Sequence, residues 1–294
     1  MFSEKRIQVV VDLMETGSDG VTLFPSKTLV LENLRVDLEI KKVFSPVGPT
    51  ATIKIYGASK QEMNTITTIA LRDTIIIEHK RVKIRVDNGN GYFTLFEGCI
   101  VEAVPVYQSA PDFYIQIESS VAAYENAMSR PPSSFPVKQV AISDLCKTIC
   151  ADYGVKCVTA PELELMPKVA PKNFEQKGLM ARMAAVCEAY GLEMIRTGLE
   201  YRVFKRGEGY RPVWTFTPNQ MIGYPSYANK MIAISTDDFA SVEVCDYFRI
   251  SGSEIPFANG LWYIVMIQYK LQSKTPNGKW EAIIHGAPQR EDKI

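Results

Sequence analysis

Four basic side chains occupy every second position of one short segment, and the last three of them alternate with apolar residues. The basic residues are His79, Arg81, Lys83 and Arg85, and the apolar ones are Val82, Ile84 and Val86. Because side chains alternate between the two faces of a β-strand, this spacing predicts a strand with one apolar face and one basic face. The basic face is either an ordinary solvated surface or a contact for an acidic protein surface or a passing nucleic acid, since attraction to phosphates needs no base readout.

We call His79, Arg81, Lys83 and Arg85 the basic stripe. Aromatic residues that could stack on bases are not interleaved with it, which argues against specific binding of a single strand. The stripe is therefore a candidate interface, and charge reversal of Arg81 and Arg85 is expected to weaken assembly.

Catalytic chemistry has little support in the sequence. The chain contains no nucleophile elbow, phosphate-binding P-loop, HExxH zinc motif or dinucleotide-binding GxGxxG motif. Its two histidines, His79 and His285, have no evident partner for acid–base work. Asp237 and Asp238 are adjacent at a predicted turn, so their carboxylates point apart. We predict no catalytic residue, no cofactor and no enzymatic activity.

Metal binding is predicted to be absent as well. Residues 87–91 resemble the start of a calcium loop, but Gly89 and Gly91 occupy ligand positions and Gly98 stands where a bidentate glutamate is needed. Among the six cysteines, Cys146, Cys150 and Cys157 lack paired C-x₂-C spacing. We interpret all six as buried free thiols.

The elements around these residues are mainly β. The sequence Asn88-Gly89-Asn90-Gly91 lies between two alternating apolar runs, which predicts a β-hairpin. Gly98 interrupts the outgoing strand, and such a glycine marks a bulge, a barrel corner or a close approach of the backbone. Residues 34–41 and 50–56 alternate in the same way, and Ser59 with Glu62 predicts a capped short helix. A barrel or sandwich is the economical solution for so many short-linked strands.

The spacing of apolar residues changes from the alternation of strands to the period of helices after a Pro- and Ser-rich stretch. We predict an N-terminal tube-like β-barrel over residues 1–126, a linker over 127–137, an α/β insert over 138–208 and a C-terminal β-barrel over 209–294. In the insert, Ser143 is expected to cap one helix, and Gly154 and Gly191 to end two. The second barrel is expected to recruit strands from before the insert.

Composition limits the partners. The chain has 33 basic and 33 acidic residues, so no global field favours nucleic acid or an anionic membrane. No stretch approaches the roughly 20 apolar residues of a membrane span, and the N-terminus has no apolar signal core. We expect the chain to fold in a cytoplasm.

Several segments, taken in order, resemble the tail or baseplate hub proteins of bacteriophages. The resemblance includes residues 53–60, 95–101 and 112–118 of the first β region, the helix ending at Tyr190 and Gly191, and residues 221–225, 232–235, 242–251, 262–268 and 280–284. It covers nearly the whole chain, and the order of the segments carries it because each motif alone is degenerate.

This resemblance implies a fold and a function. The fold is mainly β with an α/β insert, in which two tail-tube-like β-barrel domains flank a small α/β module. The function is that of a structural virion protein, the hub of a contractile-type tail baseplate. Three copies form a pseudo-sixfold ring that joins the tail tube protein to the central spike protein. The ring contacts other baseplate proteins, and DNA passes through its channel during genome ejection without specific binding. Assembly takes place in the host cytoplasm. The alternative is a tail-associated protein that degrades cell walls or binds sugars.

Overall fold

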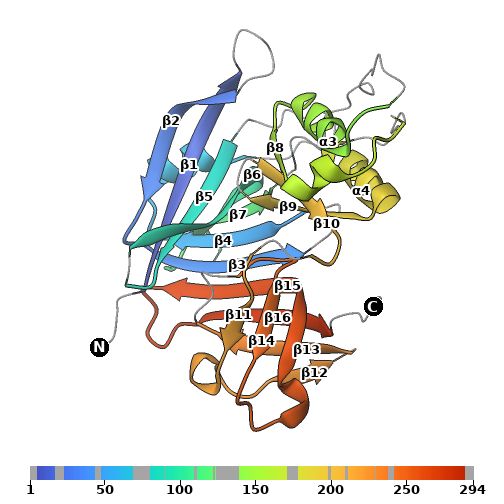
Figure 1. Cartoon of the computed structure of the whole chain (residues 1–294). Coiled ribbons are helices and arrows are strands. Elements are labelled where there is room, and N and C mark those ends of the chain that lie inside the picture. Colours follow the sequence, from blue (N-terminus) through green and yellow to red (C-terminus); the bar gives the residue numbers. More distant parts are fainter. Residues whose placement is uncertain are drawn as a thin grey trace.

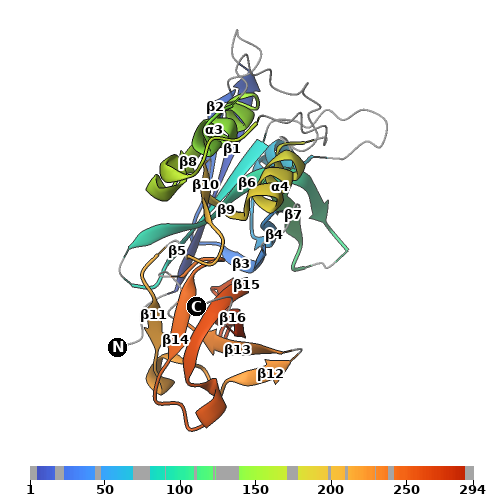
Figure 2. The ribbon, with the colours of Figure 1, turned by 45° about the vertical axis from the view of Figure 1, so that its right-hand side comes forward.

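The computed structural model describes residues 5–16, 23–43, 48–68, 80–89, 91–108, 111–121, 123, 139–170, 178–197, 200–208, 211–228, 230–237 and 242–288. Its described part is mainly β, with a small α/β module beside the first β region and a second β region at the opposite end of the molecule (Figures 1 and 2). The predicted mixture of β regions and an α/β insert is therefore confirmed at this level. The predicted linker at 127–137 lies outside the described residues.

The first β region is a curved antiparallel sheet. Its strands follow the order β3-β4-β7-β6-β5-β1-β2. Their bounds are β1 Arg6–Thr16, β2 Leu23–Leu31, β3 Arg35–Val43, β4 Thr50–Tyr56, β5 Lys80–Asp87, β6 Tyr92–Val106 and β7 Tyr114–Ser120. In β3, residues Val36, Leu38 and Ile40 are buried in the core, as their alternation predicts. Helix α1 (Lys60–Ile66) begins at Ser59 with the predicted capping box, because Glu62 N donates to Ser59 Oγ and Ser59 N donates to Glu62 Oε2.

The predicted Asn-Gly hairpin is confirmed. Strands β5 and β6 pair antiparallel, with Asp87 opposite Tyr92. The Asp87 carboxylate accepts hydrogen bonds from the backbone N–H groups of Gly89 (2.7 Å) and Gly91 (3.0 Å). Both glycines have φ near +100°, a conformation that side chains rarely adopt. These hydrogen bonds lower the pKa of Asp87, the Gly89 bond being the largest cause.

The predicted interruption of the strand at Gly98 is wrong. Strand β6 continues through Gly98, and the register shifts lie on either side of it, opposite the step from Ile84 to Arg85 and between Ile100 and Glu102. A Cβ atom at Gly98 would lie 2.8 Å from the Phe96 ring and 2.9 Å from Ser119 Oγ. Among the three roles that a strand glycine can have, close approach is the one that the structure shows.

The α/β module has its own small sheet and its own core. Strand order is β8-β10-β9, with helix α3 packed against β8 and helix α4 against β9. The bounds are α3 Ile142–Ala151, β8 Lys156–Thr159, the 3₁₀ turn η1 Pro161–Leu165, α4 Leu179–Tyr190, β9 Leu192–Thr197 and β10 Glu200–Lys205. Helix α3 begins two residues earlier than predicted, with Ala141 as its N-cap, so Ser143 lies inside it. Gly191 ends α4 in the predicted left-handed conformation.

The second β region is joined to the first through one long strand. Its elements are β11 Trp214–Phe216, η2 Pro218–Gln220, β12 Ser226–Ala228, β13 Met231–Thr236, β14 Tyr247–Ile250, η3 Pro256–Ala258, β15 Gly260–Ser273 and β16 Trp280–Pro288. The start of β15 pairs with β14, from Gly260 opposite Ile250. Its remainder pairs with β3, from Met266 opposite Val43 to Ser273 opposite Val36. One strand therefore belongs to both regions.

Two closed barrels are not seen in the pairing of the described strands. These strands form one thirteen-stranded sheet that ends at β2 and β12, with β14 and β11 branching from β15. The second edge of β3 is occupied by β15, so it is not available to close the first region against β2. Buried side chains of both β regions form one hydrophobic cluster, which also includes Ile195 and Phe204 of the α/β module; the other buried side chains of the module form a separate one. In the described part of the chain, no helix has the length and apolarity needed to cross a bilayer.

Candidate functional site

The basic stripe lies on β5, except for His79, which falls outside the described residues. Val82, Ile84 and Val86 are fully buried on the opposite face, as predicted. Arg81, Lys83 and Arg85 are each half-buried.

Neighbouring strands already supply partners for the stripe. Arg85 Nη1 donates to Gln8 Oε1 of β1 at 2.9 Å, and its guanidinium lies 5.5 Å from the centre of the Tyr92 ring. Lys83 Nζ lies 3.8 Å from Glu97 Oε1 of β6. Arg81 stands opposite Asp12 of β1 in the strand register. The stripe is therefore a mixed polar face, and an interface role for it stays a prediction.

A buried ion pair lies where the two β regions meet the α/β module. Lys42, at the end of β3, has its Nζ atom 2.7 Å from Glu243 Oε2, and the two side chains are 12% and 11% exposed. Glu243 Oε1 also accepts a hydrogen bond from the Val244 backbone N–H. Lys42 Nζ lies 5.5 Å from the centre of the buried Tyr269 ring of β15. An ion pair with so little exposed surface depends on having both partners, because either charge alone would be largely buried without compensation.

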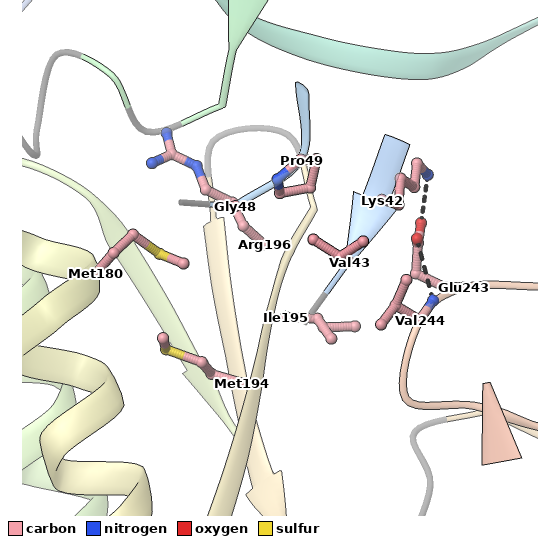
Figure 3. Close-up of a pocket in the computed structure, with 10 residues that line it drawn as sticks. All are labelled: Lys42, Val43, Gly48, Pro49, Met180, Met194, Ile195, Arg196, Glu243 and Val244. Atoms are coloured by element: carbon pink, nitrogen blue, oxygen red, sulfur yellow. Dashed lines mark hydrogen bonds and ion pairs between the residues drawn. The ribbon is translucent and has the colours of Figure 1, made fainter. Parts of the chain in front are cut away.

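An apolar seam lies beside this ion pair (Figure 3). Val43, Ile195 and Val244 lie at its centre, and Met180 of α4 and Met194 of β9 line its other side. The enclosed space is only about 30 Å³, little more than one water molecule requires. The α/β module is thus packed against the end of β3 and the turn at 242–246, with side chains filling the boundary between them.

A larger cavity opens on the other side of the ion pair. Its volume is about 350 Å³, and its lining residues come from β3, β5, β6, β9 and the second β region. The charged side chains in the lining are Lys42, Lys83, Glu97, Arg196, Arg211 and Glu243. Lys83 of the basic stripe thus faces this cavity. We call the Lys42–Glu243 pair, the seam and this cavity the junction.

Two further hydrogen bonds hold the module to the second β region. Tyr263 of β15 donates its hydroxyl to Glu193 Oε2 of β9 at 2.7 Å, and Tyr247 of β14 donates to the backbone carbonyl of Gly207 at 2.8 Å. Burial raises the pKa of the Tyr263 hydroxyl far above its ordinary value, so this group remains a donor. The junction therefore combines apolar packing, an ion pair and neutral hydrogen bonds.

Asp246, which is hydrogen-bonded to Glu243 beside the junction, has a strongly raised pKa. Its side chain is 2% exposed, Oδ2 accepts a hydrogen bond from Glu243 N at 3.0 Å, and Arg211 Nε lies 3.8 Å away. Burial raises the pKa of Asp246 from 3.8 to about 6, and the Arg211 charge opposes this rise only in part. Ionisation of Asp246 is therefore less favourable in the folded protein than in the unfolded chain.

We expect Asp246→Asn to change how stability depends on pH. Because the folded pKa of Asp246 lies above the unfolded value, its stabilising contribution is full below pH 4 and is lost as the pH rises through about 6. The variant should gain about 1–2 kcal/mol over the wild type at pH 8, less than the full pKa shift implies because attraction to Arg211 is also lost. This gain should shrink between pH 6 and pH 4. Urea unfolding at several pH values measures it, and a difference that is constant with pH would contradict the assignment.

The other sequence candidates remain apart from the junction. His285 of β16 is half-buried, and burial lowers its pKa. Asp237 is a bend residue, and Asp238 lies outside the described residues. Five cysteines are buried, as predicted, and the sixth, Cys157, is half-buried. Within the described ranges no group of three or more metal-ligating side chains is present.

Sequence reasoning missed the junction. Lys42 and Glu243 are 201 residues apart, and neither belongs to a motif. One signal for it was present. Lys42 follows Lys41 and continues the parity of the buried residues Val36, Leu38 and Ile40, so a charged side chain stands where the alternation predicts a core residue.

By sequence, the chain matches no protein-family model and no curated protein. By structure, it is similar over its whole length to tail proteins. The 43 kDa tail protein of prophage MuSo2 from Shewanella oneidensis is 10% identical, with a TM-score of 0.58 over 96% of this chain and 98% of that one. The tail protein from Neisseria meningitidis MC58 is 9% identical, with a TM-score of 0.63 over 97% of each chain.

A secretion-system protein shares the same fold. This Escherichia coli component of the type VI secretion system, described as structurally similar to T4 bacteriophage tail proteins, is 9% identical to this chain. Its TM-score is 0.60 over 88% of this chain and 74% of that one. The chain thus has the fold of phage tail proteins, and the resemblance seen in the sequence is confirmed at the level of the fold.

Proposed function

We propose that this chain is a structural hub protein of a contractile-type phage tail baseplate. In this proposal three copies, each contributing its two β regions, form a pseudo-sixfold ring in the virion that joins the tail tube to the central spike. The observation that carries the proposal is the match to tail proteins along nearly the full length of both chains.

The architecture supports such a role because both β regions are held as one body. A ring that meets a sixfold tube on one side and a threefold spike on the other needs two similar units in each subunit, fixed relative to one another. Strand β15 supplies a hydrogen-bonded link between the two regions, and the junction fixes the α/β module against both. Rigid linkage of this kind favours a scaffold.

The proposed partners are two further copies of this chain, the tail tube protein, the spike protein and other baseplate proteins. Genomic DNA would pass through the ring without specific binding, and a chain with equal numbers of basic and acidic residues suits passage without retention.

Native mass spectrometry and electron microscopy of the purified protein test this proposal. We expect a trimer, formed alone or on mixing with tube and spike proteins, with threefold images that show six similar lobes. Monomers under every one of these conditions would count decisively against the hub.

The basic stripe gives a mutational test of assembly. Arg81→Glu with Arg85→Glu should reduce the trimer fraction at least tenfold if this face contacts an acidic neighbour, because like charges would then be opposed. Arg85→Gln is the matched control, since it removes the charge while keeping a donor for Gln8. A doubly reversed variant that is folded by circular dichroism and assembles normally would remove the stripe from the interface.

We further propose that the role is non-enzymatic. The junction carboxylate of Glu243 is held by Lys42 and by a backbone N–H, an arrangement suited to structure rather than to proton transfer. Incubating the purified protein with peptidoglycan provides the test: we expect no release of soluble fragments, and turnover that a Glu or Asp substitution abolishes would instead establish a cell-wall-degrading tail protein.

A further inference from the structure

Two cysteine thiols meet in the α/β module. Cys150 lies in the last turn of α3, and Cys157 is the second residue of β8. The two thiols lie close enough for each to shift the pKa of the other. Both remain free thiols in the structure.

The chain between these cysteines folds back on itself in a tight turn. Tyr153 N and Val155 N both donate to the Cys150 carbonyl, at 3.0 and 3.1 Å, and Gly154 N donates to the Ala151 carbonyl at 2.9 Å. Gly154 has φ +68°, which a glycine adopts without strain. The turn brings β8 back along α3, so local backbone structure holds the two thiols near one another.

The two thiols have different surroundings, which suit the two steps of thiol–disulfide exchange. Cys150 is fully buried, with its Sγ atom 3.9 Å from Met183 Sδ of α4. Cys157 is half-buried and therefore open to a small reagent. The pKa of Cys157 is lowered, chiefly by its interaction with the Cys150 thiol; partial burial opposes this shift, and the charge of Lys147 adds to it. A thiol that is both accessible to a reagent and easily ionised is the one that attacks first.

We propose that Cys150 and Cys157 form a redox-responsive dithiol, which closes to an intramolecular disulfide when the protein meets an oxidised thiol compound such as glutathione disulfide. The Cys157 thiolate attacks one sulfur of glutathione disulfide, whose sulfur–sulfur bond breaks and releases one glutathione. Cys150 then loses its proton and attacks the Cys157 sulfur, releasing the second glutathione. The protein loses two electrons and two protons, and glutathione disulfide is reduced to two glutathione molecules.

Oxidation would fasten the end of α3 to β8 and leave the large sheet untouched, because the module has a core of its own. The disulfide would close a short loop, and a link of this size restricts the unfolded chain enough to raise the melting temperature by about 5 °C.

Peptide mapping tests the proposal on the full chain. Reduced protein is incubated with glutathione disulfide at pH 8 under native conditions, alkylated in denaturant and digested with trypsin. Cleavage after Lys147, Lys156 and Lys168 places the two cysteines in separate peptides, 148–156 and 157–168. We expect these peptides to appear linked, together with a rise in melting temperature that dithiothreitol reverses.

Two variants separate the two steps. Cys157→Ser should remove both the link and the rise in melting temperature. Cys150→Ala should stop the reaction at a glutathione adduct on Cys157. Cys99→Ser, a change in the core of the large sheet, is the control and should leave the link intact.

Wild-type protein that remains unreacted, or that retains only the adduct on Cys157, would overturn the proposal. So would a linked protein whose melting temperature is lowered, since the thiols would then meet only by distorting the module.

Discussion

Lys42→Met is expected to lower the free energy of unfolding by about 3–5 kcal/mol, the range for removing one partner of a buried ion pair. Methionine keeps most of the aliphatic volume of lysine, so the loss comes from the charge of Glu243. That carboxylate is 11% exposed, and without the Nζ atom at 2.7 Å it would keep only its hydrogen bond from Val244 N. Urea denaturation followed by tryptophan fluorescence measures the effect.

The neighbouring lysine provides a matched control. Lys41 is 56% exposed and lies 3.5 Å from Glu39, so Lys41→Met removes the same charge from a solvated pair and should cost less than about 1 kcal/mol. Adding Glu243→Gln to Lys42→Met should restore most of the lost stability. Equal effects of the Lys41 and Lys42 changes would show that the junction pair contributes no more than a surface pair.

Gly98→Ala is expected to destabilise the protein by about 2–3 kcal/mol, although it adds only one methyl group and replaces a residue with low β-propensity. The new Cβ atom would lie 2.8 Å from the Phe96 ring and 2.9 Å from Ser119 Oγ, distances that force both side chains to move. Neither can move easily, since Phe96 is 3% exposed and Ser119 Oγ donates to the Cys99 carbonyl at 2.8 Å.

A double-mutant cycle identifies the cause of this loss. In a Phe96→Leu background, the penalty of Gly98→Ala should fall by at least about 1 kcal/mol, because contacting residues couple. An unchanged penalty would assign the effect to the backbone instead of the ring. Calorimetry or urea denaturation of the four proteins is sufficient.

Local patterns in the sequence predicted local structure well. The alternation of β3, the capping box at Ser59 and the Asn-Gly turn depend on residues close in the chain, and the structure has all three. The apolar parity of Val82, Ile84 and Val86 was equally readable. For the same reason the overall class, β with an α/β insert, followed from changes in hydrophobic period.

Features that depend on distant pairing were not predictable from such patterns. The alternation of apolar and polar residues in β3 indicates which face of the strand is buried, but not whether β2 or β15 pairs with its edge. Closed barrels were therefore expected, whereas the described strands form an open sheet. The Lys42–Glu243 pair and the cavity beside it likewise exist only because β3, β9 and the 242–246 turn converge. Gly98 was recognised as unusual, but the identity of its neighbours required the folded strand.

Strand β15 also constrains the order in which the protein folds. Gln272 stands opposite Asp37, so the pairing that covers the edge of β3 joins residues 235 positions apart. During synthesis the first sheet must wait with that edge open until nearly the whole chain has emerged, and loop closure over this distance is slow. An open edge of alternating apolar residues is a template for pairing with other chains. Nascent chains truncated before residue 260 are thus the species most prone to aggregation. Strand β15 prevents such pairing in the complete chain because it covers the edge of β3.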